Sequence, residues 1–199
     1  MIKKNDFIRL NYTGRLDSGE VFDTTEETIA KKEHLHLHDL KPVIVCVGNN
    51  FLVESLDQDF IGKKLGRYTI KISEAFGKKR VNLLTLIPIS AFKKENIKPM
   101  PGLEVNIDGN RGLVKTVSGG RIIVDFNHPL AGRNVSYNYE IIELVNDKKE
   151  QVDSLLPKEI KTEFKDDTVI IKSKVPEELK KIISKQLEDH VKIKVKFED

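Results

Sequence analysis

The sequence of 199 residues contains one cysteine, Cys46, and no tryptophan. A single cysteine excludes an intrachain disulfide and any zinc site built on several cysteines. An excess of charge of one sign is lacking too, because 34 lysines and arginines face 31 aspartates and glutamates, a net charge of +3. This balance argues against obligate binding to nucleic acid, which usually leaves a basic stripe. Long apolar runs are also missing: residues 83–89, interrupted by Thr85 and Pro88, are far too few to cross a bilayer.

Targeting signals and familiar catalytic signatures are missing as well. The first residues, MIKKND, lack the apolar core of a signal peptide, so we expect a reducing, cytoplasmic location and no membrane partner. The sequence has no GxSxG elbow, phosphate-binding loop, HExxH helix or CxxC pair. We therefore expect no cofactor.

Alternating apolar and polar residues dominate the first part of the chain. Ile8, Leu10 and Tyr12 alternate with Arg9 and Asn11, the pattern of a half-buried strand. A turn at residues 17–19 then predicts a hairpin. We further expect strands over residues 42–47, 68–72 and 135–144, and a short amphipathic helix over residues 51–60.

Two later regions differ from the first part in residue composition and pattern. An apolar cluster over residues 84–92 precedes three short strands, expected at residues 103–107, 113–117 and 122–126, which suggest a small antiparallel sheet. Residues 149–199 hold 12 lysines and 12 acidic residues, and their pattern predicts strands around a helix that begins at Pro176. This last unit of about 50 residues is marginal alone, so we expect it to dock on a neighbour or on a second copy.

Residues 11–16 (NYTGRL) and 19–25 (GEVFDTT) carry a resemblance to a known family. They resemble the N-terminal signature of FKBP-type peptidyl-prolyl isomerases, in which a tyrosine strand and a hairpin lead to Phe-Asp and a hydroxyl residue. Further family segments follow in order, at residues 45–48, at the helix over 51–60, at 73–77 (SEAFG) and at 124–132 (VDFNHPLAG). The last closely resembles a motif of the SlyD-like branch, which carries an inserted flap domain just before it.

The resemblance implies an α+β fold, in which a curved antiparallel FKBP-like sheet lies over a short helix. A small β-rich flap domain is inserted, and a C-terminal α+β domain resembles that of the long archaeal members. We expect a discontinuous isomerase domain over residues 1–83 and 129–147, the flap over 84–128, and the C-terminal domain over 148–199. A homodimer through the C-terminal domain is left open.

An isomerase of this kind needs no nucleophile, because no covalent bond breaks. The barrier of roughly 18–20 kcal/mol comes from amide resonance, and an apolar pocket lowers it by removing water from the planar amide and holding the twisted state. The resemblance implies a pocket lined by Tyr12, Phe22, Val53, Leu56, Phe76 and Tyr137. The resemblance also implies that Asp23 is the polar residue that orients the substrate and that the backbone N–H of Val53 donates a hydrogen bond to a substrate carbonyl. It further implies that His128 and Leu130 close the pocket.

Two positions depart from the family pattern. Phe76 replaces the usual tyrosine and so lacks a hydroxyl for the substrate carbonyl, while Leu56 stands where human-type members have tryptophan. The resemblance therefore implies activity, with Phe76 as a reason for a reduced rate and both positions as reasons for weak affinity for macrolide inhibitors. A plainer interpretation makes Tyr12, Phe22 and Tyr137 ordinary core residues, with Asp23 and His128 as turn residues.

The inserted region suggests a second activity. In SlyD-like proteins the flap binds extended apolar segments of unfolded chains, and here Ile87, Ile89, Phe92 and Met100 are the candidates for that contact. The expected partners are unfolded or nascent polypeptides that contain proline. The alternative is that these four residues form the small core of the insert itself.

Other functions remain open beside this one. Residues His34, His36 and His38 have spacing that suits a transition metal on a strand, although we expect adventitious binding rather than a physiological site. The strand-and-glycine rhythm of residues 102–126 also fits an RNA- or ribosome-binding module, and salt-dependent RNA binding would support it. A third alternative is a holdase chaperone with a weakly active pocket.

Overall fold

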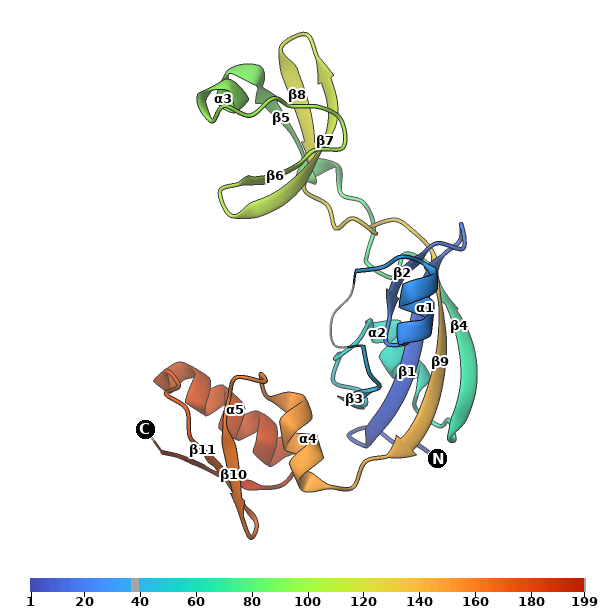
Figure 1. Ribbon diagram of the computed structural model, residues 1–199, viewed down its shortest axis with the longest axis vertical. Coiled ribbons are helices and arrows are strands. Elements are labelled where there is room, and N and C mark those ends of the chain that lie inside the picture. The colour runs from blue at the N-terminus through green and yellow to red at the C-terminus, as the bar shows by residue number, and fades with distance from the viewer. Residues whose placement is uncertain (37–39, 199) are drawn as a thin grey trace. The chain divides into compact units, whose positions relative to one another are not determined.

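The computed structural model describes residues 1–36 and 40–198. The chain divides into two compact units, Met1–Ile72 together with Val135–Asp199, and Ser73–Asn134 (Figure 1). The insert expected at residues 84–128 lies within the second of these. Each unit is built on its own antiparallel sheet, and each is described separately below.

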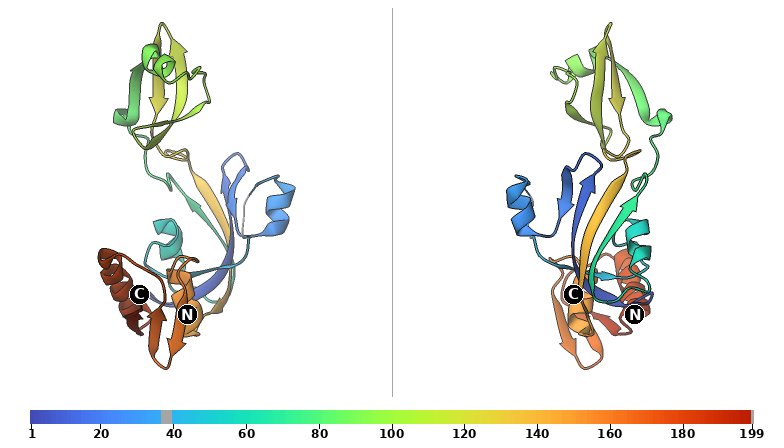
Figure 2. Two further views of the ribbon diagram at one scale, coloured as in Figure 1. Left: turned by 60° about the vertical axis from the view of Figure 1, so that its left-hand side comes forward. Right: turned by 90° about the vertical axis from the view of Figure 1, so that its right-hand side faces the viewer.

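The main unit contains a five-stranded antiparallel sheet. Its strands are β1 (Phe7–Leu16), β2 (Val21–Thr24), β3 (Val43–Cys46), β4 (Gly66–Ile72) and β9 (Val135–Leu144). They follow the order β2-β1-β9-β4, and β3 pairs with the first half of β1. The long strands curve, as the two views of Figure 2 show, and the short helices are α1 (Glu27–Lys32) and α2 (Glu54–Asp59). The expected α+β architecture, with a curved sheet and a short helix, is confirmed.

Helix α2 is shorter than the helix expected over residues 51–60. It begins only after Val53, because the chain before it turns through left-handed conformations at Gly48 (φ +81°) and Asn50 (φ +57°). The apolar residues at positions 52 and 53 fit a helical spacing but lie in the loop that leads into α2. The apolar spacing alone therefore extended the predicted helix too far.

The C-terminal part of the chain packs into the main unit. It contains α4 (Lys148–Leu155), β10 (Thr162–Lys165), β11 (Thr168–Ile171), α5 (Glu177–His190) and β12 (Lys194–Phe197). Helix α5 joins β11 to its parallel neighbour β12. The hydrophobic core of this C-terminal segment includes Phe7 of β1 and Cys46 of β3. The segment therefore docks on a neighbour within the same chain, which adds to the area that its 50 residues bury.

The second unit holds a four-stranded antiparallel sheet in the order β5-β8-β7-β6. Its elements are η1 (Val81–Leu83), β5 (Leu84–Pro88), α3 (Ile89–Lys94), β6 (Glu104–Ile107), β7 (Asn110–Ser118) and β8 (Arg121–Asp125). Three of these strands match the expected ones. The apolar cluster over residues 84–92 divides at Pro88 into a strand and a helix. Sequence pattern had given it no secondary structure, because a short apolar run fits either.

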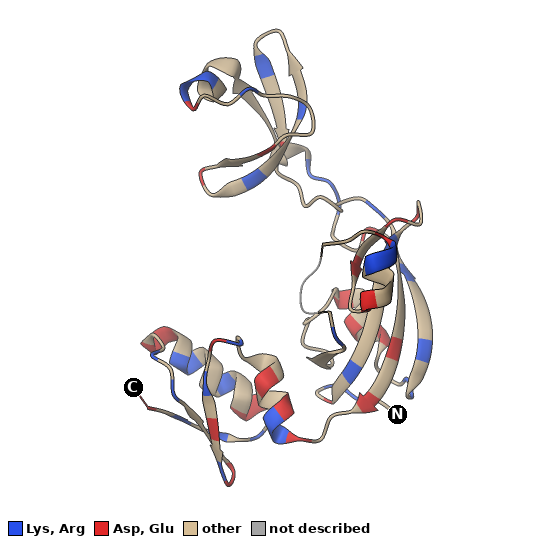
Figure 3. Ribbon diagram, in the orientation of Figure 1, with Lys and Arg blue, Asp and Glu red and all other residues tan. Residues whose placement is uncertain are grey.

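Charged residues are distributed over both units without separation by sign. Figure 3 shows lysine and arginine interspersed with aspartate and glutamate along the strands and helices. Among the described residues, no helix is long and apolar enough to span a membrane.

Candidate active site

Four of the expected pocket residues meet on one face of the main sheet. The Tyr12 hydroxyl donates a hydrogen bond of 2.8 Å to Oδ2 of Asp23. The Tyr137 ring meets the Phe22 ring edge to face at 5.7 Å and the Tyr12 ring at 6.0 Å. Such edge contacts favour defined ring orientations. The result is an aromatic wall with one carboxylate held beside it.

An irregularity in strand pairing brings Phe22 and Asp23 to the same place. Neighbouring residues of a regular strand point to opposite faces of the sheet. Here Gly14 pairs with Asp23 while Arg15 pairs with Val21, so Phe22 is an extra residue in β2. A bulge of this kind re-aims side chains, and it allows the Phe22 ring and the Asp23 carboxylate both to contact tyrosines of the wall.

Gly14 makes room for this arrangement. A methyl group on Gly14 would lie 2.6 Å from Cζ of Phe22 and 2.9 Å from Cε1 of Tyr137, well inside van der Waals contact. The residue is buried at the centre of the aromatic cluster. Gly14 lies in the segment that resembles the family signature, but the sequence pattern predicts no role for it. The rings determine that role, because they occupy the space of a side chain.

The environment keeps the pocket tyrosines protonated. Burial, followed by the nearby Asp23 charge, raises the pKa of Tyr137 to about 12. Burial also raises the pKa of Tyr12, with further contributions from the Asp23 charge and the hydrogen bond to it. The Tyr12 hydroxyl therefore remains a donor at neutral pH and fixes the Asp23 carboxylate, which supports the expected orienting role of Asp23.

The helix α2 carries the expected floor of the pocket. Leu56 is fully buried, and Val53 is the half-buried residue that precedes the first turn. At the other end of the helix, the Tyr139 hydroxyl donates a 2.5 Å hydrogen bond to Oδ2 of Asp59. Because β9 supplies both Tyr137 and Tyr139, one strand supports the aromatic wall and anchors the helix.

The remaining three expected pocket residues, Phe76, His128 and Leu130, belong to the second unit. The rings of Phe76 and His128 stack with centroids 4.6 Å apart and only 5° between their planes. The backbone N–H of Leu130 donates to Nδ1 of His128 at 3.1 Å, so a neutral His128 carries its proton on Nε2. The Ala-Phe-Gly and Asn-His-Pro segments are thus joined by a ring contact, and their part in the pocket stays a prediction.

Asn127 also links the two chain segments at the base of the insert. Its side-chain oxygen accepts from the backbone N–H of Arg80 at 2.8 Å, and its amide nitrogen donates to the Arg80 carbonyl at 3.0 Å. The same nitrogen donates to Asp125. Asn127 belongs to the Asn-His-Pro motif, but no sequence pattern predicts its hydrogen bonds to Arg80.

Three of the four apolar candidates in the insert lie in or against its core. Phe92 is 4% exposed, Ile87 and Ile89 pack against the same cluster, and Met100 is 54% exposed. Leu84 and Leu86, which the sequence did not single out, are 42% and 55% exposed on β5. They alternate with Ile87 along the strand and lie on the sheet face opposite to the core.

The histidine run is described only in part. His34 and His36 are exposed, and His38 lies outside the described residues. Within residues 1–36 and 40–198, no group of three or more histidine, cysteine, aspartate or glutamate side chains is arranged to hold a metal ion.

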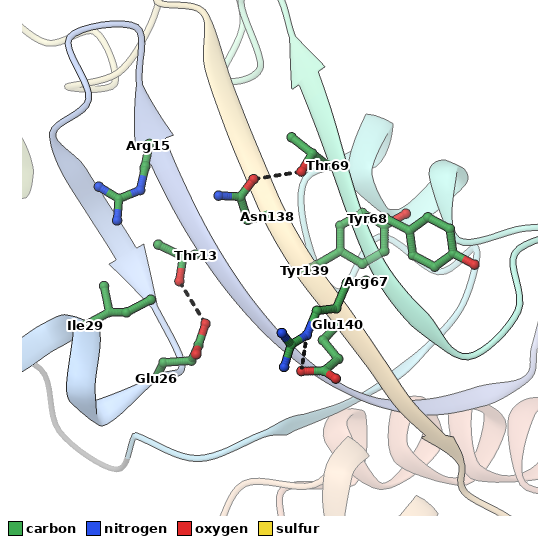
Figure 4. Close-up of a pocket in the computed structure, with 10 residues that line it drawn as sticks. All are labelled: Thr13, Arg15, Glu26, Ile29, Arg67, Tyr68, Thr69, Asn138, Tyr139 and Glu140. Carbon is green, nitrogen blue, oxygen red and sulfur yellow. Dashed lines mark hydrogen bonds and ion pairs between the residues drawn. The ribbon is translucent and has the colours of Figure 1, made fainter.

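A polar depression of about 540 Å³ lies on the other face of the main sheet (Figure 4). Thr69 donates to Asn138 there, Thr13 donates to Glu26, and Arg67 pairs with Glu140. None of the nine expected pocket residues lines it. Its side chains satisfy one another, so the aromatic face is the stronger candidate site.

Comparison with known proteins identifies the family. Residues 85–130 match the family model described as "FKBP26, IF domain". A probable FKBP-type 16 kDa peptidyl-prolyl cis-trans isomerase from Pseudomonas fluorescens is 30% identical over 151 residues, which cover 72% of this chain and 91% of that protein. The chain belongs to the FKBP-type peptidyl-prolyl cis-trans isomerase family.

Two further FKBP-type relatives fit this assignment. A short-type peptidyl-prolyl cis-trans isomerase from Methanocaldococcus jannaschii is 27% identical over 71% of this chain and 92% of its own length. The SlyD protein of Vibrio cholerae is 26% identical over 71% of this chain and 67% of its own. The resemblance that the motifs implied is therefore confirmed at the level of the FKBP family, with SlyD-like relatives.

Proposed function

We propose that this FKBP-family enzyme isomerises X–Pro bonds in unfolded polypeptides at the aromatic face of the main sheet, and that its insert binds those polypeptides as a chaperone. The cluster of Tyr12, Phe22, Asp23 and Tyr137 is the observation that carries the isomerase part. It joins apolar ring surface to one oriented carboxylate and contains no serine, cysteine, lysine or histidine. That composition suits a reaction that rotates a bond without breaking it.

Catalysis in such a pocket is differential binding. Planar amides are polar and well hydrated, so an apolar wall destabilises the planar amide relative to the twisted one. Rigid rings at fixed angles select a geometry rather than a chemical group. In this proposal Tyr12 and Asp23 orient the peptide, and the backbone N–H of Val53 binds a substrate carbonyl.

The insert supports the chaperone part through its exposed surface. Leu84 and Leu86 lie on β5, which is an edge strand because only β8 pairs with it. An extended peptide can add to such an edge by backbone hydrogen bonds, while exposed leucines bind its apolar side chains. Met100 is comparably exposed and remains a candidate contact. The proposed occupant is an extended apolar segment of an unfolded chain.

The isomerase part is tested by catalysis of proline-limited refolding, with a proline tetrapeptide as a second substrate. Replacing Asp23 by alanine removes the acceptor of Tyr12, and we expect kcat/KM to fall about tenfold or more on both substrates. Glu20→Ala is the matched control, because it removes an exposed acid from the same hairpin. An unchanged rate in Asp23→Ala, with clients still bound, would instead favour a holdase with a weakly active pocket.

We also propose a homodimer through the C-terminal segment. Leu179 and Ile182 are 48% and 60% exposed on α5, beside the apolar stripe that carries buried Ile183 and Leu187. Replacing both by serine should lower the sedimentation coefficient of a dimer to that of a monomer. A wild-type protein that is monomeric at high concentration would contradict this proposal.

A further inference from the structure

Asp57 is a buried carboxylate that faces the protein backbone rather than solvent. The residue is 1% exposed. Its Oδ1 accepts from the backbone N–H of Gly48 at 3.0 Å, and its Oδ2 accepts from the backbone N–H of Asn50 at 2.8 Å. A buried carboxylate without partners is very unfavourable, and hydrogen bonds to a charged acceptor are among the stronger ones. Each oxygen of Asp57 is thus committed to the loop that precedes its own helix.

That loop depends on Asp57 for its shape. Gly48 and Asn50 both have positive φ, and the loop leads directly to Val53. No side chain of the described residues caps the N-terminus of α2. Asn49 donates to the carbonyl of Val47 and to Sγ of Cys46, which fixes the start of the loop to the end of β3. Asp57, reaching back from the helix, connects the middle of the loop to α2.

We propose that Asp57 is a positioning residue for the pocket. It holds the loop from Gly48 to Val53 so that the backbone N–H of Val53 is ready for the substrate carbonyl. The adjacent Leu56 belongs to the same turn of α2, so one carboxylate fixes the polar contact and the apolar floor relative to each other. This inference rests on the proposed isomerase function, because it assigns the loop a role in binding substrate.

The same helix supplies a matched control. Asp59 lies two residues later and also accepts hydrogen bonds through its carboxylate, but its partners are Tyr139 and Lys63. Asp57→Asn and Asp59→Asn therefore remove the same charge from the same helix, at its loop side and its sheet side. Both variants are expected to be less stable, because each weakens a satisfied acceptor.

The test compares kcat and KM of the two variants on a proline tetrapeptide, at a temperature where both are folded. We expect Asp57→Asn to raise KM about tenfold with kcat nearly unchanged, because the loop binds ground state and transition state alike. Asp59→Asn should change KM much less, because its hydrogen bond lies at the sheet side of α2 and not at the loop. In NMR spectra, the amide signal of Val53 should move in Asp57→Asn and stay in place in Asp59→Asn.

Two results would overturn the inference in different ways. If the wild type is active and Asp57→Asn behaves like Asp59→Asn, the positioning role is wrong while the proposed function stands. If the wild type itself is inactive, the proposed function fails and the positioning role with it. Should Asp57→Asn fail to fold, Asp57→Glu keeps the charge but displaces it by one methylene group, and the same rise in KM is expected.

Discussion

The main sheet and the sheet of the insert have similar architecture, but the side chains of their candidate surfaces differ. Each is antiparallel, each carries a bulge, and each has a short helix beside it. On the main sheet the candidate site is an aromatic wall, and a hydrogen bond to Asp23 fixes its Tyr12. On the insert the candidate surface is aliphatic, through exposed Leu84 and Leu86. The rigid rings of the main sheet suit recognition of one peptide geometry, whereas the leucines of the insert suit apolar contact with varied side chains.

A strand glycine lies at the centre of each sheet and allows the comparison to be tested directly. Gly14 faces Phe22 and Tyr137, and Gly112 of β7 would place a methyl group 2.5 Å from Val124 and 2.8 Å from Phe126. Neither glycine has a positive φ, so alanine can adopt either backbone. Substitutions at these two positions therefore test packing alone.

The largest effect is expected for Gly14→Ala. The added methyl group must displace the Phe22 or Tyr137 ring, and displacement of a binding surface by about 1 Å costs on the order of 100-fold in rate. Tetrapeptide kcat/KM should fall by about that factor, while binding of an unfolded client remains. A variant with wild-type kcat/KM would show that the aromatic wall is not the active site.

Gly112→Ala should give the opposite result. Overpacking costs about 1–3 kcal/mol, a large share for a core whose buried members are Phe92, Val105, Val114, Ile122 and Val124. Client binding and hydrogen-exchange protection of the insert should fall, and tetrapeptide kcat/KM should stay within about twofold because the two units have separate cores. Equal loss of both activities would contradict the proposal that the main sheet catalyses isomerisation and the insert binds the client.

A smaller effect is expected from the exposed face of the insert. Replacing Leu84 and Leu86 by serine removes exposed apolar area without touching the core, so stability should change by less than about 0.5 kcal/mol. Client affinity, measured by titration with a permanently unfolded protein, should fall at least about tenfold, since burying one leucine is worth about 1.5–3 kcal/mol and a tenfold change in affinity is about 1.4 kcal/mol.

Met100→Ser provides the comparison for that surface, because Met100 has nearly the same exposure as Leu86. A loss of affinity only in Met100→Ser would move the client site from the β5 face to the loop before β6. A loss in neither variant would remove the exposed face from the proposal.

The smallest expected effect is the dependence of stability on pH: the main unit should lose stability in alkali and the insert in acid. All four tyrosines lie in the main unit, and the pKa of Tyr137 is raised to about 12. The unfolded chain releases that proton near pH 10, so this contribution to stability is complete below pH 10 and is lost as pH rises toward about 12. Near-ultraviolet circular dichroism of the tyrosines measures the unfolding of the main unit in alkaline solution.

The insert should instead lose stability in acid. Burial opposes ionisation of Asp125, but hydrogen bonds from Asn127 and the charge of Lys79 outweigh it, so the pKa of Asp125 lies below its ordinary value. The unfolded state then binds a proton first, and stability present above about pH 4 is lost as pH falls through the folded pKa. Asp125→Asn should flatten the acid dependence of hydrogen exchange in the insert, and an unchanged slope would contradict this assignment.

Sequence pattern predicted most strands and the family, and it failed where one segment depends on another. The strand over residues 135–144 is observed with these bounds, because alternation reports a buried face directly. The helix expected from residue 51 begins at 54, since Asp57 holds the loop before it in a conformation that apolar spacing does not encode. The sequence pattern does not predict strand β10 and helix α4, because their apolar residues become core only through packing against β3, β11 and α5.

The sequence by itself determined the family, the α+β class and the candidates Tyr12, Phe22, Asp23 and Tyr137, because ordered motifs survive in residue identity and spacing. Only tertiary structure decided how those candidates meet. The bulge that turns Phe22 and Asp23 toward one face is a property of strand pairing, and the need for glycine at position 14 is a property of two rings from other strands. Both depend on distances between segments far apart in the chain, which local pattern cannot carry.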